Sequence, residues 1–210
     1  MHAPPSKSPA TASAFADWVF RQHHPSPRDF TDYGKATRAN RLAQGSRTHL
    51  DIELFLHHKW TVGYLGKGRS TGWSLYFADN QESPRKTFKA SRLNYEGVPL
   101  RCIPDLVLIE DRTGEVMIIE RKTTFIAKPE IPRDGWPNVE AQLWCYSWID
   151  EFLGSPKIHL VGQLWTKARY GGVSLCHRHP SWIRGNSDHE TRCGYWFNNY
   201  GGRYNPANTS

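Results

Sequence analysis

Asp105, Glu120 and Lys122 are the residues whose types and spacing best support chemistry. Asp105 begins an apolar stretch that runs into a turn, and Glu120 lies in the apolar stretch that follows. If the turn centres between Arg112 and Thr113, opposed residues have numbers that sum to 225, and Asp105 directly faces Glu120. Directly opposed side chains share one face, with Cβ atoms about 4.5–5.5 Å apart. Lys122 shares that face because it lies two residues beyond Glu120.

Two opposed carboxylates repel each other, so this predicted hairpin needs a positive counter-charge. Lys122 supplies one, and a divalent cation would supply more, since carboxylate oxygens suit Mg²⁺ and Mn²⁺. The alternative is a solvated face on which the acids and the lysine form ordinary salt bridges, and the hairpin alone does not decide between the two. Both strands are rich in Val, Ile and Leu on both faces, which favours a buried position. Buried charges must be compensated, and they cluster at functional sites.

Two further motifs flank this hairpin. Gly45 and Ser46 precede His49 in a helical stretch, and their small size would let that helix bring His49 to the carboxylates. An imidazole ligand would favour Mn²⁺ over Mg²⁺ somewhat. Gln142 and Tyr146 are four residues apart, so they project side by side from one helix face. Taken singly, these positions are also typical of ordinary core residues.

Four short motifs therefore follow one another along the chain: GxxxH at 45–49, Pro104-Asp105, Glu120-Arg121-Lys122 and QxxxY at 142–146. Their order resembles the PD-(D/E)XK nuclease superfamily and its RecB-like branch, over about residues 36–166. The resemblance implies an α/β fold with a restriction-endonuclease-like core, in which a central mixed, mostly antiparallel sheet is flanked by helices. It also implies a metal-dependent DNA nuclease that hydrolyses phosphodiester bonds with metal-activated water. Such an enzyme is expected to be exonuclease-like and to act in DNA processing, repair or phage-related defence.

The resemblance assigns three kinds of role. The catalytic residues would be Asp105, Glu120 and Lys122. One or two Mg²⁺ or Mn²⁺ ions would be held by His49, Asp105, Glu120 and the backbone carbonyl of Arg121. The substrate strand would be contacted, and the site supported, by Gln142 and Tyr146.

Single- or double-stranded DNA is the expected partner, with a helicase or another protein subunit as a second one. The residue pattern leaves endonucleolytic cutting and an RNA substrate open. The alternative function is a catalytically silent nucleic-acid-binding or helicase-partner module with the same fold. The intact trio of Asp105, Glu120 and Lys122 argues against that alternative, because a pure binder does not need so costly a cluster.

The four cysteines are widely and irregularly spaced, at positions 102, 145, 176 and 193. This spacing indicates reduced thiols in a cytoplasmic protein rather than a disulfide framework. The RecB-like branch includes CRISPR-associated exonucleases that bind an iron–sulfur cluster through four cysteines, but the cysteines here are not grouped in that way. A tetrahedral zinc site is suggested by Cys176, His179, His189 and Cys193, with a polar loop as the alternative.

Periodicity and turn signals indicate the elements that must position these residues. Helices are predicted at 14–22, 35–59 and 136–153, with a break at Gly45. Strands are predicted at 61–65, 73–78, 86–95, 98–110, 115–124, 157–167 and 172–176. Residues 1–13 are predicted to form a flexible tail, 14–178 the nuclease domain, and 179–210 an irregular extension packed on or near the core.

Composition agrees with this interpretation without requiring it. The 210 residues include 27 Lys+Arg and 20 Asp+Glu, a net charge of +7 that favours a polyanionic partner only slightly over a merely basic protein. The length suits one domain. The sequence has neither a membrane-length apolar run nor the apolar core of a secretory signal, so no membrane partner is expected.

Basic residues alternate with aromatic residues and glycine in three places. Such a mixture can follow a phosphate backbone and stack on bases. A solvated hairpin tip explains the first of these stretches equally well. The three places are 67–73, 84–89 and the C-terminal set of Trp182, Arg184, Arg192, Tyr195, Trp196 and Arg203.

Overall fold

The computed structural model describes residues 9–23, 72–79, 86–123, 136–167, 173–178 and 182–205. The predicted helix at 35–59 and the predicted strand at 61–65 lie outside these residues.

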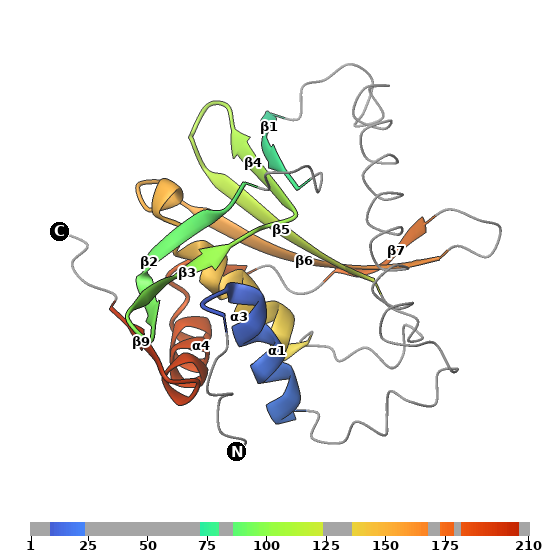
Figure 1. Ribbon diagram of the computed structural model, residues 1–210. Helices are drawn as coiled ribbons and strands as arrows, with labels where there is room; N and C mark the ends of the chain where they lie inside the picture. The colour runs from blue at the N-terminus through green and yellow to red at the C-terminus, as the bar shows by residue number, and fades with distance from the viewer. Residues whose placement is uncertain are drawn as a thin grey trace.

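Six strands form a mixed sheet at the centre of the molecule (Figure 1). Its order is β1 (Trp73–Ala78), β4 (Leu106–Glu110), β5 (Val116–Thr123), β6 (Ile158–Lys167) and β7 (Val173–Arg178), with β8 (Trp182–Ile183) also paired to β6. Only β5 and β6 run parallel; the other pairs are antiparallel. The predicted α/β class, with a mixed and mostly antiparallel sheet flanked by helices, is confirmed.

The β4–β5 hairpin has the predicted register. Leu106 pairs with Ile119 and Val107 with Ile118, so opposed residues do sum to 225. Gly114 ends the turn with a φ of +72°, a left-handed conformation that glycine adopts without strain. The chain before β4 and the end of β5 therefore meet at the open end of the hairpin.

The predicted single strand over 98–110 is wrong, because the chain changes sheets within it. β3 (Val98–Cys102) pairs with β2 (Phe88–Tyr95), which pairs with β9 (Gly202–Tyr204) in a separate three-stranded sheet. The main sheet begins again only at Leu106, the first residue of β4. Pro104 accounts for the interruption, since it has no N–H to donate to a ladder.

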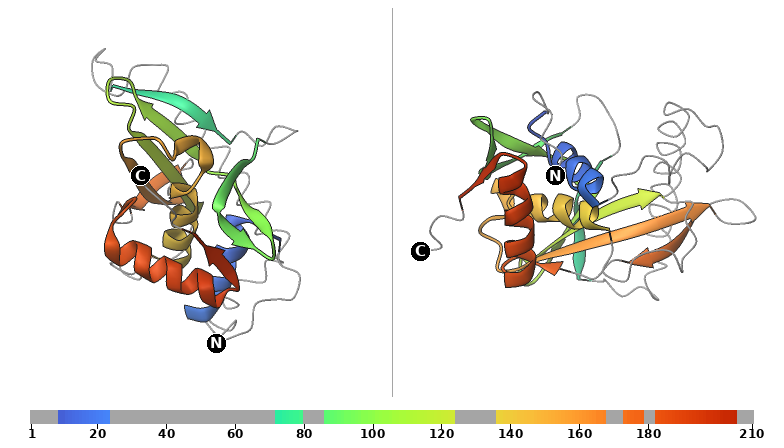
Figure 2. Two further views of the ribbon diagram at one scale, coloured as in Figure 1. Left: turned by 90° about the vertical axis from the view of Figure 1, so that its left-hand side faces the viewer. Right: turned by 90° about the horizontal axis from the view of Figure 1, so that it is seen from below.

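α3 (Pro137–Ser147) is a central helix. Every residue from Val139 to Ser147 is buried, as expected for a helix covered on all sides. It contacts β5 and β6 of the main sheet, β2 and β3 of the small sheet, and α1 (Ala12–His23) (Figure 2). The predicted helix through 153 instead ends at Ser147, and a 3₁₀ turn, η3 (Asp150–Phe152), follows it.

α1 begins inside the stretch predicted to be a flexible tail. Thr11 caps the helix, because its Oγ1 accepts the N–H of Ala14 at 3.1 Å. Thr11 also pairs with Arg101 beside β3. Phe15 is fully buried, with its ring centroid 5.1 Å from that of Phe197. Residues 9–13 therefore belong to the fold.

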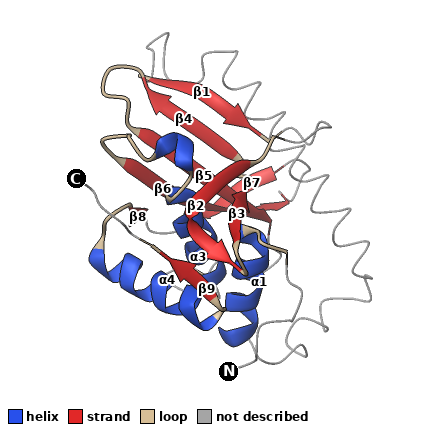
Figure 3. Ribbon diagram, turned by 60° about the vertical axis from the view of Figure 1, so that its left-hand side comes forward, coloured by secondary structure: helices blue, strands red, loops and turns tan. Residues whose placement is uncertain are grey.

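The C-terminal extension is not irregular as predicted, because it contains α4 (Ser187–Asn199) followed by β9. The side chain of Asn186 caps α4 by accepting the N–H of His189. The buried positions His189, Cys193 and Phe197 recur every four residues. His189 and Cys193 are not typical apolar core residues. The apolar pattern of the sequence therefore does not reveal the helix. Figure 3 shows α1, α3 and α4 gathered together beside the sheets.

In the described ranges, none of the helices combines the length and the apolar character needed to cross a bilayer.

Replacing Phe15 by alanine should lower the free energy of unfolding by about 3–5 kcal/mol, because a fully buried aromatic ring is lost from the core. Urea denaturation followed by circular dichroism measures this change. Tyr195→Ala is the matched control: its side chain is 57% exposed on α4, and the change should stay within about 0.5 kcal/mol. Equal effects of the two variants would contradict the packing of α1 into the core.

Candidate active site

Asp105 and Glu120 lie together at the open end of the β4–β5 hairpin. Asp105 is 8% exposed and Glu120 3% exposed. The carboxylate Oδ2 of Asp105 accepts the backbone N–H of Arg121 at 2.6 Å, and the guanidinium of Arg121 donates to the Asp105 carbonyl at 3.2 Å. These bonds join the start of β4 to the end of β5. The structure thus brings the two predicted acids to one buried place.

Lys122 completes the predicted trio. Its Nζ donates to Oε1 of Glu120 at 2.6 Å and to Oε1 of Gln142 at 2.9 Å, and its side chain is 32% exposed. Burial would lower the pKa of Lys122, but the carboxylates of Glu120 and Asp105 outweigh burial and raise that pKa above its usual value. The ammonium is therefore charged at neutral pH and remains partly open to solvent.

Gln142 and Tyr146 lie on α3, directly behind Lys122. Nε2 of Gln142 donates to the hydroxyl of Tyr146 at 2.6 Å, and that hydroxyl donates to the carbonyl of Ile103 at 2.9 Å. Burial and two nearby carboxylates raise the pKa of Tyr146 well above its usual value, so the phenol stays protonated. Gln142 is 4% exposed and Tyr146 fully buried. Both side chains therefore support Lys122 from the core side.

α1 adds two residues that the sequence motifs do not identify. Oγ of Ser13 lies 3.5 Å from Nε2 of Gln142. Asp17, one helical turn later, contributes a third negative charge that raises the pKa of Lys122. Both are exposed positions at helical spacing in the sequence, so α1 was recognisable as amphipathic. The sequence near α1 does not show which element its polar face contacts, because tertiary packing decides that contact.

Two predicted metal-ligand assignments stay predictions. His49 and its GxxxH motif lie outside the described residues. Arg121 lies in β5 between Glu120 and Lys122, and its backbone N–H and its guanidinium both donate to Asp105. The role of its carbonyl as a ligand is untested.

A second polar cluster joins α3 to α4. Glu140, His189 and Cys193 are buried, and their ligand atoms lie within 4.8 Å of one another, so the group could hold a metal ion. The sequence pairs His189 and Cys193 in its suggested zinc site, and their Nδ1 and Sγ are 3.7 Å apart. Glu140 is a member that the sequence does not suggest. His179 and the side chain of Cys176 lie outside the described residues.

Glu140 is already paired in this cluster. Its Oε1 lies 3.0 Å from Nδ1 of His189, and its two oxygens accept Nε of Arg192 at 2.9 and 3.1 Å. Burial would raise the pKa of Glu140, but the hydrogen bonds from His189 and Arg192 outweigh it and lower that pKa below its usual value. The carboxylate is therefore ionised at neutral pH and links the two helices.

Several basic residues that the sequence assigns to a phosphate backbone are bound within the protein itself. Nζ of Lys86 lies 4.5 Å from the ring centroid of Phe88 and 3.6 Å from Oε2 of Glu151. Arg184 donates to backbone carbonyls that follow α3, and Arg192 pairs with Glu140. Residues 67–71 lie outside the described ranges.

Comparison with known proteins adds little. No protein-family model matches the chain, and no curated protein matches it. A solved structure described as "Crystal structure of SSO0001" is similar at a TM-score of 0.40 and 12% sequence identity, covering 92% of this chain and 76% of that one. A likeness this weak supports no conclusion about activity.

The ion pair of Glu140 predicts a pH dependence of stability. Because the folded-state pKa lies below the unfolded value, the ionised carboxylate stabilises the fold above the usual glutamate pKa of about 4.3 and stops doing so as the pH falls through the folded-state pKa. The free energy of unfolding of the wild type should therefore exceed that of Glu140→Gln at pH 7, and the difference should shrink on acidification. Urea titrations from neutral pH to below about pH 4 measure it. A constant difference over this range would contradict the assignment.

Proposed function

We propose that the chain is a divalent-metal-dependent deoxyribonuclease of the PD-(D/E)XK, RecB-like type. The observation that carries the proposal is the convergence of three separate sequence motifs in one hydrogen-bonded group. Lys122 links Glu120 of the hairpin to Gln142 of α3, and Tyr146 links α3 to the chain just before Asp105. Core residues at helical spacing would have no reason to meet the one lysine of this hairpin.

The donor set fits Mg²⁺ or Mn²⁺. Asp105 and Glu120 offer hard carboxylate oxygens, which these ions prefer. One oxygen of Asp105 accepts the backbone N–H of Arg121, and one oxygen of Glu120 accepts the ammonium of Lys122. A carboxylate offers about four acceptor sites over its two oxygens, so these bonds are compatible with metal ligation by both acids. A divalent cation held there supplies the Lewis acidity and the activated water that phosphodiester hydrolysis needs.

Lys122 provides positive charge where the reaction creates negative charge. Phosphodiester hydrolysis passes through a transition state in which the phosphate is more anionic than in the substrate. Among the described residues, the ammonium donates to Glu120 and Gln142. An ammonium has three N–H groups, so one remains within these ranges to donate to a phosphate oxygen. A preorganised charge of this kind stabilises the transition state without rearrangement.

Gln142 and Tyr146 keep that ammonium in position. Gln142 accepts from Lys122 through Oε1 and donates to Tyr146 through Nε2, so its amide has one favourable orientation. Tyr146 is itself anchored on the carbonyl of Ile103. The lysine is therefore held by groups that do not depend on substrate.

Glu120→Gln should abolish metal-dependent DNA cleavage, with a loss of about 10³-fold or more, because one of the two carboxylates that would hold the divalent cation loses its charge. The measurement is hydrolysis of labelled single- and double-stranded DNA with Mg²⁺ or Mn²⁺. Glu115→Gln is the matched control, since Glu115 lies at the turn end of the same hairpin and pairs with His159. It should retain activity.

Undiminished cleavage by Glu120→Gln would show that the active site is not the group formed by Asp105, Glu120 and Lys122. If the wild type neither cleaved DNA nor bound Mn²⁺ in titration calorimetry, a catalytically silent binding module would replace the nuclease.

Gln142→Ala separates support of Lys122 from contact with substrate. If Gln142 positions the ammonium, kcat should fall, by up to about 10²-fold for a displacement near 1 Å, while KM changes little. If it grips the strand directly, KM should rise instead. Steady-state cleavage kinetics on a short oligonucleotide distinguish the two, and a raised KM with unchanged kcat would overturn the positioning role.

A further inference from the structure

The small sheet carries an unusual pair of basic residues on its outer face. Lys89 of β2 and Arg101 of β3 are direct cross-strand partners, and both are exposed. Their neighbours on the inner face, among them Phe88 and Leu100, are buried in the core. The two cations therefore point to the same side, away from the helices.

Like charges directly opposed in an antiparallel pair destabilise a sheet. A carboxylate beside them would relieve the repulsion. In the part of the chain that the structure describes, the side chains of Lys89 and Arg101 form no ion pair or hydrogen bond. The carboxylate of Asp150 accepts the backbone N–H and the hydroxyl of Ser91, two residues along β2 from Lys89. In the described ranges it forms no ion pair with Lys89 or Arg101, so neither cation has a carboxylate in direct contact.

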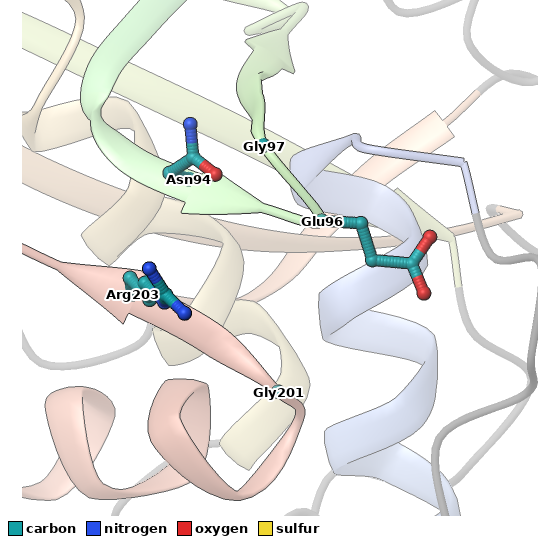
Figure 4. A pocket seen from close by; sticks show the side chains of 5 residues that line it. All are labelled: Asn94, Glu96, Gly97, Gly201 and Arg203. Carbon is teal, nitrogen blue, oxygen red and sulfur yellow. The ribbon is translucent and has the colours of Figure 1, made fainter.

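β2 is irregular between Ala90 and Asn94, and beyond this shift the outward position is Asn94, between the buried Leu93 and Tyr95. A hollow lies at this end of the outer face. Asn94 of β2 and Arg203 of β9 are also cross-strand partners, and with Glu96, Gly97 and Gly201 they line a space of about 270 Å³. Figure 4 shows the carboxylate of Glu96 pointing away from Asn94 and Arg203. A third basic side chain therefore follows the first two along one sheet face.

Arg101 is close along the chain to the candidate active site. Arg101 precedes Asp105 by four residues, which extended chain spans in about 14 Å at most. The sheet change at Pro104 lies between them. A strand of nucleic acid lying over Arg101 would thus have a phosphodiester within a few nucleotides of the carboxylates.

We propose that the outer face of the small sheet, defined by Lys89, Arg101 and Arg203, binds the phosphate backbone of a nucleic-acid strand and leads it to the hairpin site. The proposal rests on the nuclease function proposed above for its substrate. Charge complementarity selects the occupant, because a polyanion relieves the repulsion between Lys89 and Arg101 and releases counterions on binding.

The test compares Lys89→Gln/Arg101→Gln with the wild type by fluorescence anisotropy on single-stranded and double-stranded oligonucleotides. Binding is measured in EDTA at several salt concentrations, so the result does not depend on cleavage. Losing two phosphate contacts should reduce the slope of log K against log salt by about 1.4 for single strands, or about 1.8 for a duplex. The affinity of the double variant at low salt should also fall. The oligonucleotide that shows the larger change, single-stranded or double-stranded, is the form that the face binds. The urea midpoint should stay equal or rise, because repulsion has been removed.

Arg112→Gln is the matched control, since Arg112 is an exposed cation at the turn of the β4–β5 hairpin, at the opposite end of that hairpin from Asp105 and Glu120. It should bind as the wild type does. An unchanged slope in the double variant, or an equal change in Arg112→Gln, would overturn the proposal. Either result would leave the proposed nuclease function untouched, because the cleavage assay of Glu120→Gln decides that function. Conversely, a protein that does not cleave DNA would still show the expected salt dependence of binding.

Discussion

Two carboxylates buried at the end of one hairpin impose the constraint on which the rest of the site depends. Asp105 and Glu120 are almost out of solvent, and burying a carboxylate costs several kcal/mol unless it is compensated. Part of the compensation comes from the backbone N–H of Arg121, which Asp105 accepts, and from the ammonium of Lys122, which donates to Glu120. Lys122 must therefore stay where it is, and the amide and the phenol behind it are the groups that hold it.

α3 supplies the side chains that hold Lys122, and its own burial adds a second constraint. As a helix buried on all sides, it must find partners for every polar group that it carries. Gln142 finds its partners toward the main sheet, and Glu140 finds its partners on α4. The two polar clusters are thus two residues apart on one helix. The ion pair with α4 fixes the rotation of α3, and that rotation determines where Gln142 meets Lys122.

Local patterns predicted the hairpin well because its register depends on nearby residues alone. The turn at 111–114 sets the register of the two apolar strands that flank it, and this places Asp105 against Glu120 without reference to any other element. Helix spacing likewise puts Gln142 beside Tyr146. The failures involve long-range packing. Pro104 marks an interruption, but only the pairing of β3 with β2 turns it into a change of sheet. Ser13 reaches the site because α1 packs on α3, and α4 was hidden because His189 and Cys193 occupy its apolar stripe.

The complete burial of α3 also bears on how long the site keeps its geometry. Amide protons in a helix with no solvent-facing side exchange with solvent only when large parts of the protein open, whereas exposed helices fray on their own. Gln142 and Tyr146 belong to such a segment. The backbone that carries these two supports of the lysine is therefore tied to the slowest opening motions of the protein, so it should keep its place through many substrate encounters.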